Sequence, residues 1–225
     1  MPQLEPTSRS DASTRDAIKV AARTLFTERG VDAVSVRDIV AAAGQRNGGA
    51  VHYHFGSIDN LLRELVVDGA RPLDQRRSKR LDVLEKSGGP TLVREVVAVL
   101  VEPIVEGGAD EHNYIRFLSM MQFGHHRTLF LEALGGRWNT GWQRALKHLK
   151  HLLPDLPLAV LKQRMIFLEL FIGTAVAQRE HAIANTLTFD RPWRPGYTMD
   201  NLIDSLSGML QAPASAETLA RVERS

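Results

Sequence analysis

The stretch of residues 35–55, SVRDIVAAAGQRNGGAVHYHF, constrains the fold more than any other part of this chain. Its first half places apolar side chains at the spacing of one helical face: Val36, Ile39, Val40 and Ala43. Gly44 follows at once, where a left-handed backbone ends a helix at the least steric cost. Val51 and Phe55, four residues apart, supply the inner face of a second helix. We therefore predict a helix, a glycine turn and a second helix.

Ser35 marks the start of the first helix, because Asp38 stands three residues later and completes an approximate capping box. A helix-turn-helix presents its second helix to the major groove of DNA. We predict that Arg46 and Asn47 begin that helix, where arginine suits guanine and asparagine suits adenine through paired hydrogen bonds. Spacing alone also fits two ordinary core helices, so both interpretations stay open at this point.

The length and the charge of the chain narrow the class of protein. Its 225 residues suffice for one large or two small domains, and two are favoured, with the smaller one first. The net charge is only +2, and residues 1–70 hold one more acidic than basic side chain. This balance weighs against a nonspecific DNA binder, whose affinity comes from neutralised phosphates, and leaves a site-specific reader possible.

The absence of cysteine and the hydropathy of the chain exclude further classes of protein. The chain has no cysteine, which rules out disulfides and thiol chemistry. No apolar run reaches the roughly 20 residues that cross a bilayer, and the first residues lack the apolar segment of a signal peptide. We expect a soluble, cytoplasmic protein with no membrane partner.

Helical periodicity predicts an all-α fold in four parts. Residues 1–12 are expected to form a disordered arm and residues 13–56 a three-helix DNA-binding domain. Residues 57–211 should form a second helical domain, and residues 212–225 a flexible tail. A helix from residue 57 should bend near Pro72, and the RRSKR run at 76–80 is more typical of a solvated face than of a nucleic-acid patch.

Two segments carry a family resemblance: TRDAIKVAARTLFTERGVDAVSVRDIVAAAG, and YHFGSIDNLL after it. They resemble the N-terminal domain of the tetracycline-repressor (TetR) family of bacterial transcriptional regulators over roughly residues 14–65. The resemblance implies a homodimer that binds a palindromic operator and is released by an inducer in its second domain. It also implies dimerisation through the last two long helices, here about residues 158–183 and 200–211.

The helix-turn-helix motif and the family resemblance together indicate which residues contact DNA. His52, Tyr53 and His54 fall where the family places residues that touch DNA, and Arg37 would reach phosphates from the preceding helix. The full set of candidate DNA-binding residues is Ser35, Arg37, Gln45, Arg46, Asn47, Gly48, His52, Tyr53 and His54.

The second domain carries bulky, soft side chains on two predicted helices. Such side chains are usually core, yet a pocket lined by them would suit a largely apolar effector, with a polar group such as His125 to orient it. The candidate ligand-binding residues are Phe117, Met120, Met121, His125, Trp138 and Trp142.

Two other functions compete with DNA binding. A metal or acid–base enzyme would draw on the histidines of the second half of the chain: His112, His125, His126, His148 and His151. His148 and His151 lie three residues apart on one helical face and could share a metal, but no carboxylate falls at a recognised ligand spacing. We therefore expect no catalysis, no metal and no cofactor. A helical interaction module without a DNA role is the other alternative.

Overall fold

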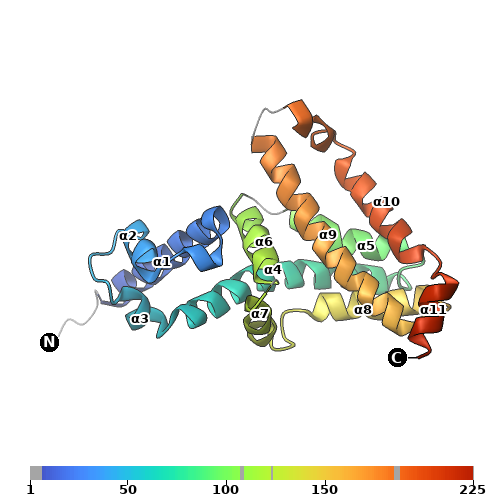
Figure 1. Cartoon of the computed structure of the whole chain (residues 1–225), viewed down its shortest axis with the longest axis horizontal. Helices are drawn as coiled ribbons and strands as arrows, with labels where there is room; N and C mark the ends of the chain where they lie inside the picture. Colours follow the sequence, from blue (N-terminus) through green and yellow to red (C-terminus); the bar gives the residue numbers. More distant parts are fainter. Residues whose placement is uncertain (1–6, 107–108, 123, 185–187, 225) are drawn as a thin grey trace. The chain divides into compact units, whose positions relative to one another are not determined.

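The computed structural model describes residues 7–106, 109–122, 124–184 and 188–224, and every regular element among them is helical (Figure 1). The predicted all-α class is therefore confirmed. The chain divides into two compact units. The first contains Met1–Gly69 and Arg116–Gly135, and the second contains Ala70–Ile115 and Gly136–Ser225.

The first unit is built around the predicted three-helix arrangement. Its elements are α1 (Thr7–Arg29), η1 (Val31–Ala33), α2 (Val36–Ala42), α3 (Ala50–Phe55), the start of α4 (Ile58–Lys86), the end of α6 (Ala109–Met121) and α7 (His126–Leu134). The fully buried side chains of Ile18, Phe26, Ile39, Leu61 and Leu65 form the core. These apolar side chains come from α1, α2 and α4, and their burial holds the short helices in place.

The predicted boundary at residue 56 differs from the observed grouping. The prediction assigned residues 57–211 to one domain, whereas the structure groups Arg116–Gly135 with the N-terminal helices. The reason is a contact distant in sequence, because the rings of Phe26 and Phe117 stack with centroids 6.0 Å apart. The Arg116 guanidinium also donates to the carbonyl oxygen of Thr27 over 3.2 Å.

The second unit holds the remaining helices. They are the rest of α4, α5 (Val93–Val105), the first part of α6, α8 (Thr140–Leu152), α9 (Leu158–Ala184), η2 (Thr188–Trp193), α10 (Thr198–Gln211) and α11 (Ala216–Val222). Helix α10 packs against α5 and α9, and α8 packs against the same two helices. Fully buried Leu100, Leu149, Leu161 and Leu168 occupy the centre of this unit.

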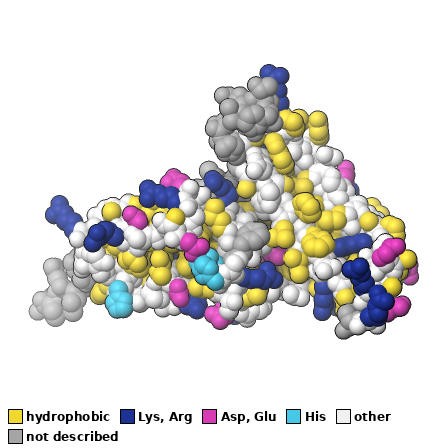
Figure 2. All heavy atoms as spheres, viewed as in Figure 1, with side chains coloured by type: hydrophobic (Ala, Val, Ile, Leu, Met, Phe, Trp, Pro, Cys, Tyr) yellow, Lys and Arg dark blue, Asp and Glu magenta, His cyan; other side chains and the backbone are white. Residues whose placement is uncertain are grey.

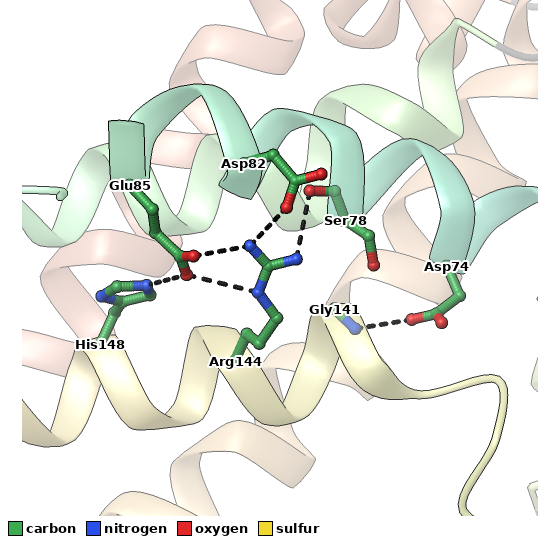
Figure 3. A network of polar contacts seen from close by, with 7 residues as sticks. All are labelled: Asp74, Ser78, Asp82, Glu85, Gly141, Arg144 and His148. Atoms are coloured by element: carbon green, nitrogen blue, oxygen red, sulfur yellow. Dashed lines mark hydrogen bonds and ion pairs between the residues drawn. The ribbon is translucent and has the colours of Figure 1, made fainter. Parts of the chain in front are cut away.

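Helix α8 is joined to α4 by a polar network (Figure 3). The Arg144 guanidinium donates to Asp82 over 2.7 Å and to Glu85 over 2.8 Å, and the His148 ring lies 2.8 Å from the same Glu85 carboxylate. Hydrogen bonds from Arg144 and His148 lower the pKa of Glu85 from its ordinary 4.5 to about 2. At the start of α8, the backbone N–H of Gly141 donates to the buried Asp74 carboxylate over 2.7 Å.

The run RRSKR is not a solvated face. Arg76 donates to the carbonyl oxygen of Pro103 over 3.1 Å, and Arg77 donates to that of Leu100 over 2.9 Å. Arg80 pairs with Glu102 over 2.5 Å. Because these groups lie near the C-terminal end of α5, the arginines donate to carbonyl oxygens there and oppose the negative end of the helix dipole.

The predictions of a disordered arm over residues 1–12 and of a flexible tail over residues 212–225 are each wrong in part. Helix α1 begins at Thr7, so residues 7–12 are helical, while residues 1–6 lie outside the described residues. Residues 7–12 contain no proline or glycine, and a helix nucleated downstream gains one hydrogen bond for each residue added. In the predicted tail over 212–225, α11 starts where the Ser215 hydroxyl accepts from the N–H of Thr218 over 3.2 Å.

The predicted range of α9 is confirmed, whereas the predicted bend of α4 at Pro72 is not. Helix α9 matches the predicted Leu158–Ile183 segment, and the glycines at 135 and 136 separate α7 from α8. Helix α4, in contrast, runs through Pro72 without ending, because buried apolar residues on both sides hold the helix where proline removes one hydrogen bond. None of the helices in the described ranges combines the length and apolarity that spanning a membrane requires.

Candidate nucleic-acid interface

The predicted capping box fixes the start of α2. The backbone N–H of Asp38 donates to the Ser35 hydroxyl oxygen over 3.2 Å, and the N–H of Ser35 donates to the Asp38 carboxylate over 2.9 Å. The hydrogen bond from the Ser35 hydroxyl is the main cause that lowers the pKa of Asp38. Ile39 and Val40 are buried, which leaves Arg37 on the exposed side of the helix.

The predicted glycine turn follows α2. Gly44 has φ +68°, and its N–H donates to the carbonyl oxygen of Ala41 over 3.0 Å. The N–H of Gln45 donates to the carbonyl oxygen of Val40 over 3.0 Å, so the end of the helix is closed by the turn itself. The Gln45 side chain donates back to Ala43 and is half-buried.

The second helix starts later than predicted. Helix α3 begins at Ala50, so Arg46 and Asn47 precede the helix instead of opening it. The Asn47 side-chain oxygen accepts from the N–H of Gly49 over 2.9 Å, and the Asn47 carbonyl accepts from Ala50 over 3.1 Å. Asparagine and paired glycines favour such a turn over helix, because the side chain satisfies the backbone and glycine carries a helical penalty.

The two faces of α3 differ as the sequence predicted. Val51 and Phe55 are buried against the rest of the first unit, whereas His52 is exposed and Tyr53 is 75% exposed. The half-buried His54 ring meets the Tyr53 ring edge-on, with centroids 4.9 Å apart. The outer face of this short helix therefore presents imidazole and phenol groups to solvent.

Arg15 holds the end of α3. Its guanidinium donates to the carbonyl oxygen of His54, pairs with Glu64 on α4, and lies over the Phe55 ring at 4.5 Å. This single side chain satisfies a carbonyl at the C-terminal end of α3, which six residues alone leave without a helical partner.

Lys19, one turn after Arg15, extends the ion pairing between α1 and α4. Its ammonium lies 3.0 Å from Glu64 and 2.8 Å from Asp68. Burial lowers the pKa of Lys19, but the hydrogen bonds and charges of Asp68 and Glu64 outweigh it and raise the pKa overall. Sequence analysis missed this ion-pair ladder, although the signal is present: two basic residues four apart on one helix match two acidic residues four apart on another.

The predicted ligand-binding residues fall in both units. Phe117 and Met121 are fully buried in the first unit, with Met120 half-buried and His125 exposed beside them. Trp138 and Trp142 belong to the second unit, where each is half-buried. The guanidinium of Arg71 lies 5.1 Å from the Trp138 ring centroid and that of Arg77 lies 5.7 Å from the Trp142 ring centroid.

A groove in the second unit has a different lining. Its volume is about 390 Å³, and none of the six predicted residues contributes to it. The apolar part of its wall comes from the α8–α9 connection and from the segment between α10 and α11, with Leu152, Leu156, Leu210 and Leu219 among the lining residues.

The segment that contains α2 and α3 is similar in sequence to known bacterial regulatory proteins. The model of the bacterial regulatory proteins of the tetR family matches residues 18–65. Over 82 residues the chain is 37% identical to the HTH-type transcriptional repressor KstR2 of Mycolicibacterium smegmatis (strain ATCC 700084 / mc(2)155). That match covers 35% of this chain and 40% of the repressor, so the aligned part spans less than half of the relative.

One solved structure shares the fold over most of its length. The crystal structure of the probable transcriptional regulatory protein RHA5900 superposes with a TM-score of 0.53 at 23% identity, covering 89% of this chain and 99% of the other. PfmR, a TetR family transcriptional regulator from Thermus thermophilus, gives a TM-score of 0.47 at 19% identity and covers 88% and 99%. The matched residues 18–65 include α2, the glycine turn and α3. Over these residues the chain is similar to the tetR family of bacterial regulatory proteins.

Proposed function

We propose that this protein is a transcriptional repressor that binds a palindromic DNA operator as a homodimer and is released by a small, largely apolar effector. The observation that carries the DNA-binding part is the exposed face of α3, which Arg15 holds in place within the segment matched by the family model. The proposal includes no catalysis, and it places the regulator with DNA in the cytoplasm.

We propose different roles for the candidate DNA contacts. His52 and Tyr53 on the outer face of α3 enter the major groove, and Arg46 and Arg37 approach from the preceding loop and helix. Asn47 is proposed to donate to a base through its side-chain NH2 group, because the Gly49 N–H occupies one lone pair of its side-chain oxygen and turns that oxygen toward the backbone. Ser35 acts through its cap of α2, and Gln45, Gly48 and His54 line the same surface.

The homodimer is proposed to form through α9 and α10. Four large apolar side chains of helix α9 are exposed: Ile166, Phe167, Phe171 and Ile183. Figure 2 shows hydrophobic side chains at the surface of the region where Figure 1 draws α9. Ile166, Phe167 and Phe171 lie within two turns of one another, and exposed apolar side chains grouped in this way mark an interaction site. Two such helices from each protomer would bury it in a four-helix bundle.

The effector is proposed to act by preferring one of two conformations. A ligand that binds better to the form with mis-spaced recognition helices lowers DNA affinity by its differential affinity for the two forms. Trp138 and Trp142 belong to the proposed binding region, so a compound that quenches their fluorescence should also release DNA. Binding with no change in DNA affinity would remove the regulatory role.

The test of DNA binding measures fluorescence anisotropy of duplex DNA from the region upstream of the coding sequence. The wild-type protein should bind at least one such duplex far more tightly than a scrambled duplex of equal length. Tyr53→Ala should weaken that binding by about 10-fold or more, the range of one lost base contact. Tyr197→Ala removes a similarly exposed tyrosine from the second unit and should leave the affinity unchanged.

Equal affinity of the wild-type protein for the upstream and scrambled duplexes would overturn the repressor proposal. A wild-type preference that persists in Tyr53→Ala would keep DNA binding and remove Tyr53 from the reading face. Circular dichroism of each variant confirms that its helices remain folded.

A further inference from the structure

Two histidines and one aspartate that lie far apart in the sequence meet in the first unit. The Asp32 carboxylate oxygen Oδ1 lies 3.3 Å from His125 Nε2 and 2.9 Å from His126 Nε2. One potential ligand atom from each residue lies within 4.8 Å of the other two. The three side chains thus point their donor atoms at one small volume.

We propose that Asp32, His125 and His126 form a binding site for a divalent transition-metal ion such as Zn²⁺. In tetrahedral zinc sites, bond lengths of about 2.0–2.2 Å place neighbouring ligand atoms roughly 3.3 Å apart, which the distances between Asp32 and the two rings approach. Imidazole nitrogen suits zinc, copper and nickel, whereas magnesium and calcium prefer a shell of oxygens.

The surroundings of the cluster permit an ion to enter. The side chains of Asp32 and His125 are 72% and 73% exposed, whereas that of His126 is only 14% exposed and is therefore held by its neighbours. The rings of His125 and His126 lie with centroids 3.9 Å apart, so both face the same carboxylate. Three protein ligands leave further coordination positions for water or for a small anionic ligand.

The site connects two segments that matter for DNA binding. Asp32 lies in η1, which leads into the Ser35 cap of α2, while His125 and His126 begin α7. The end of α1 already contacts α6 through the Phe26–Phe117 stack. A bound ion adds a link that is independent of apolar packing, so it stabilises one arrangement of the helix-turn-helix against α7 in preference to others.

Sequence reasoning missed this site because its carboxylate is distant. Among the histidines, it considered His148 and His151 on one helical face as a metal pair, but the structure pairs His148 with Glu85. Asp32 stands more than 90 residues before His125, so no ligand spacing in the sequence links them. Only the packing of α6 against α1 brings them together.

The test uses the full-length, untagged protein and zinc as the probe. Isothermal titration calorimetry should show one Zn²⁺ per chain, and Asp32→Ala and His126→Ala should each lower the affinity by at least the 10- to 100-fold that loss of an outer-shell partner costs. His151→Ala removes an exposed histidine of α8 and should change nothing. Cobalt provides a second readout, because the chain lacks cysteine and its visible bands then report only nitrogen and oxygen ligands.

Zinc uptake that is equal in the wild-type protein, Asp32→Ala and His126→Ala would overturn the site, as would its loss in His151→Ala alone. A second arm rests on the proposed repressor function and repeats the DNA titration with and without Zn²⁺. Zinc should change the DNA affinity of the wild-type protein and not that of His126→Ala. Because metal binding is measured without DNA, its failure is distinguishable from the failure of the repressor proposal.

Discussion

The stability of the first unit depends strongly on the Arg15 side chain. One guanidinium contacts the carbonyl end of α3, a carboxylate of α4 and the face of Phe55. Arginine suits this place because its planar group can donate in two directions while stacking on a ring, whereas lysine offers only a point charge. The position of the α3 end therefore depends on the identity of this residue as well as on its charge.

Arg15→Ala should lower the free energy of unfolding by about 1 to 2 kcal/mol, since the lost hydrogen bonds are charge-assisted but the side chain is 37% exposed to screening water. Arg15→Lys should recover only part of that loss, because it keeps the ion pair without the fork. Urea denaturation followed by circular dichroism measures both. Full recovery by lysine would show that charge alone holds α3.

Glu85 predicts a pH dependence of the second unit. Its pKa is about 2 in the folded protein against an ordinary 4.5, so its stabilising effect is complete above pH 4.5 and is lost as the pH falls toward 2. Glu85→Gln should therefore lower the thermal midpoint near pH 6, and the difference from the wild-type protein should shrink as the pH falls through this window. Asp155→Asn, outside the network, serves as the control in thermal scans; a constant wild-type-to-Gln difference would contradict the assignment.

Asn47 shows how far single residues could be predicted from the sequence. Its type suggested a base-reading amide, and its exposure agrees with a surface role. The hydrogen bond to Gly49, however, depends on where α3 begins, and two glycines shift that start by several residues. Residue chemistry is readable from sequence, but the atoms left available depend on local hydrogen bonds that compete with the helix.

At the scale of elements, α8 is placed by a glycine. A Cβ on Gly141 would lie 2.7 Å from the Cβ of Arg77 and 3.2 Å from Asp74, so α8 approaches α4 more closely than any other residue type permits. The Gly141 N–H bond to Asp74 uses this approach. The glycine pair at 135 and 136 that separates α7 from α8 is visible in the sequence, whereas this contact is not, because it depends on a residue 67 positions away.

Gly141→Ala should lower the free energy of unfolding by about 1 to 3 kcal/mol, the usual cost of forcing extra atoms into a packed site. Gly208→Ala is the matched control, because a Cβ there meets nothing within 4 Å and alanine favours a helix by about 1 kcal/mol over glycine. Urea titration of both variants should give opposite signs. Equal, small effects would show that α8 can move away from α4 without loss.

Element type and most helix limits followed from periodicity, caps and glycines, as for α2 and α9. Pro72 and the RRSKR run were misjudged for one reason: both lie on α4, and neighbours from distant parts of the chain decide their effect. Buried apolar side chains carry the helix through Pro72, and the end of α5 takes up Arg76, Arg77 and Arg80. Local rules describe a helix in solvent, and tertiary contacts override them.

The exposed apolar side chains of α9 bear on how two copies of the protein would assemble. Phe171 is 58% exposed on a helix whose other side is buried in the second unit. Periodicity predicted a long amphipathic helix here but did not distinguish an intrachain core from a dimer interface. Exposure favours the interface, because a monomer gains nothing from placing large rings in water.

Phe171→Glu should convert the proposed dimer to a monomer, since it places a charge in an apolar interface, and should weaken operator binding because the two half-sites are then engaged separately. Size-exclusion chromatography with light scattering reports the mass. Val83→Glu replaces another exposed apolar residue, on α4, and should leave the dimer intact. A dimer that survives Phe171→Glu would move the interface away from α9.

The ion-pair ladder of Arg15 and Lys19 with Glu64 and Asp68 affects how salt titrations of DNA binding should be interpreted. The slope of affinity against salt is normally converted into a number of neutralised phosphates. Salt also screens this partly exposed ladder, in which Arg15 holds the end of α3 in the free protein. Part of the slope then comes from the loss of order in α3, so the apparent number of phosphate contacts exceeds the true one. Measuring the unfolding of the free protein at the same salt concentrations separates the two contributions.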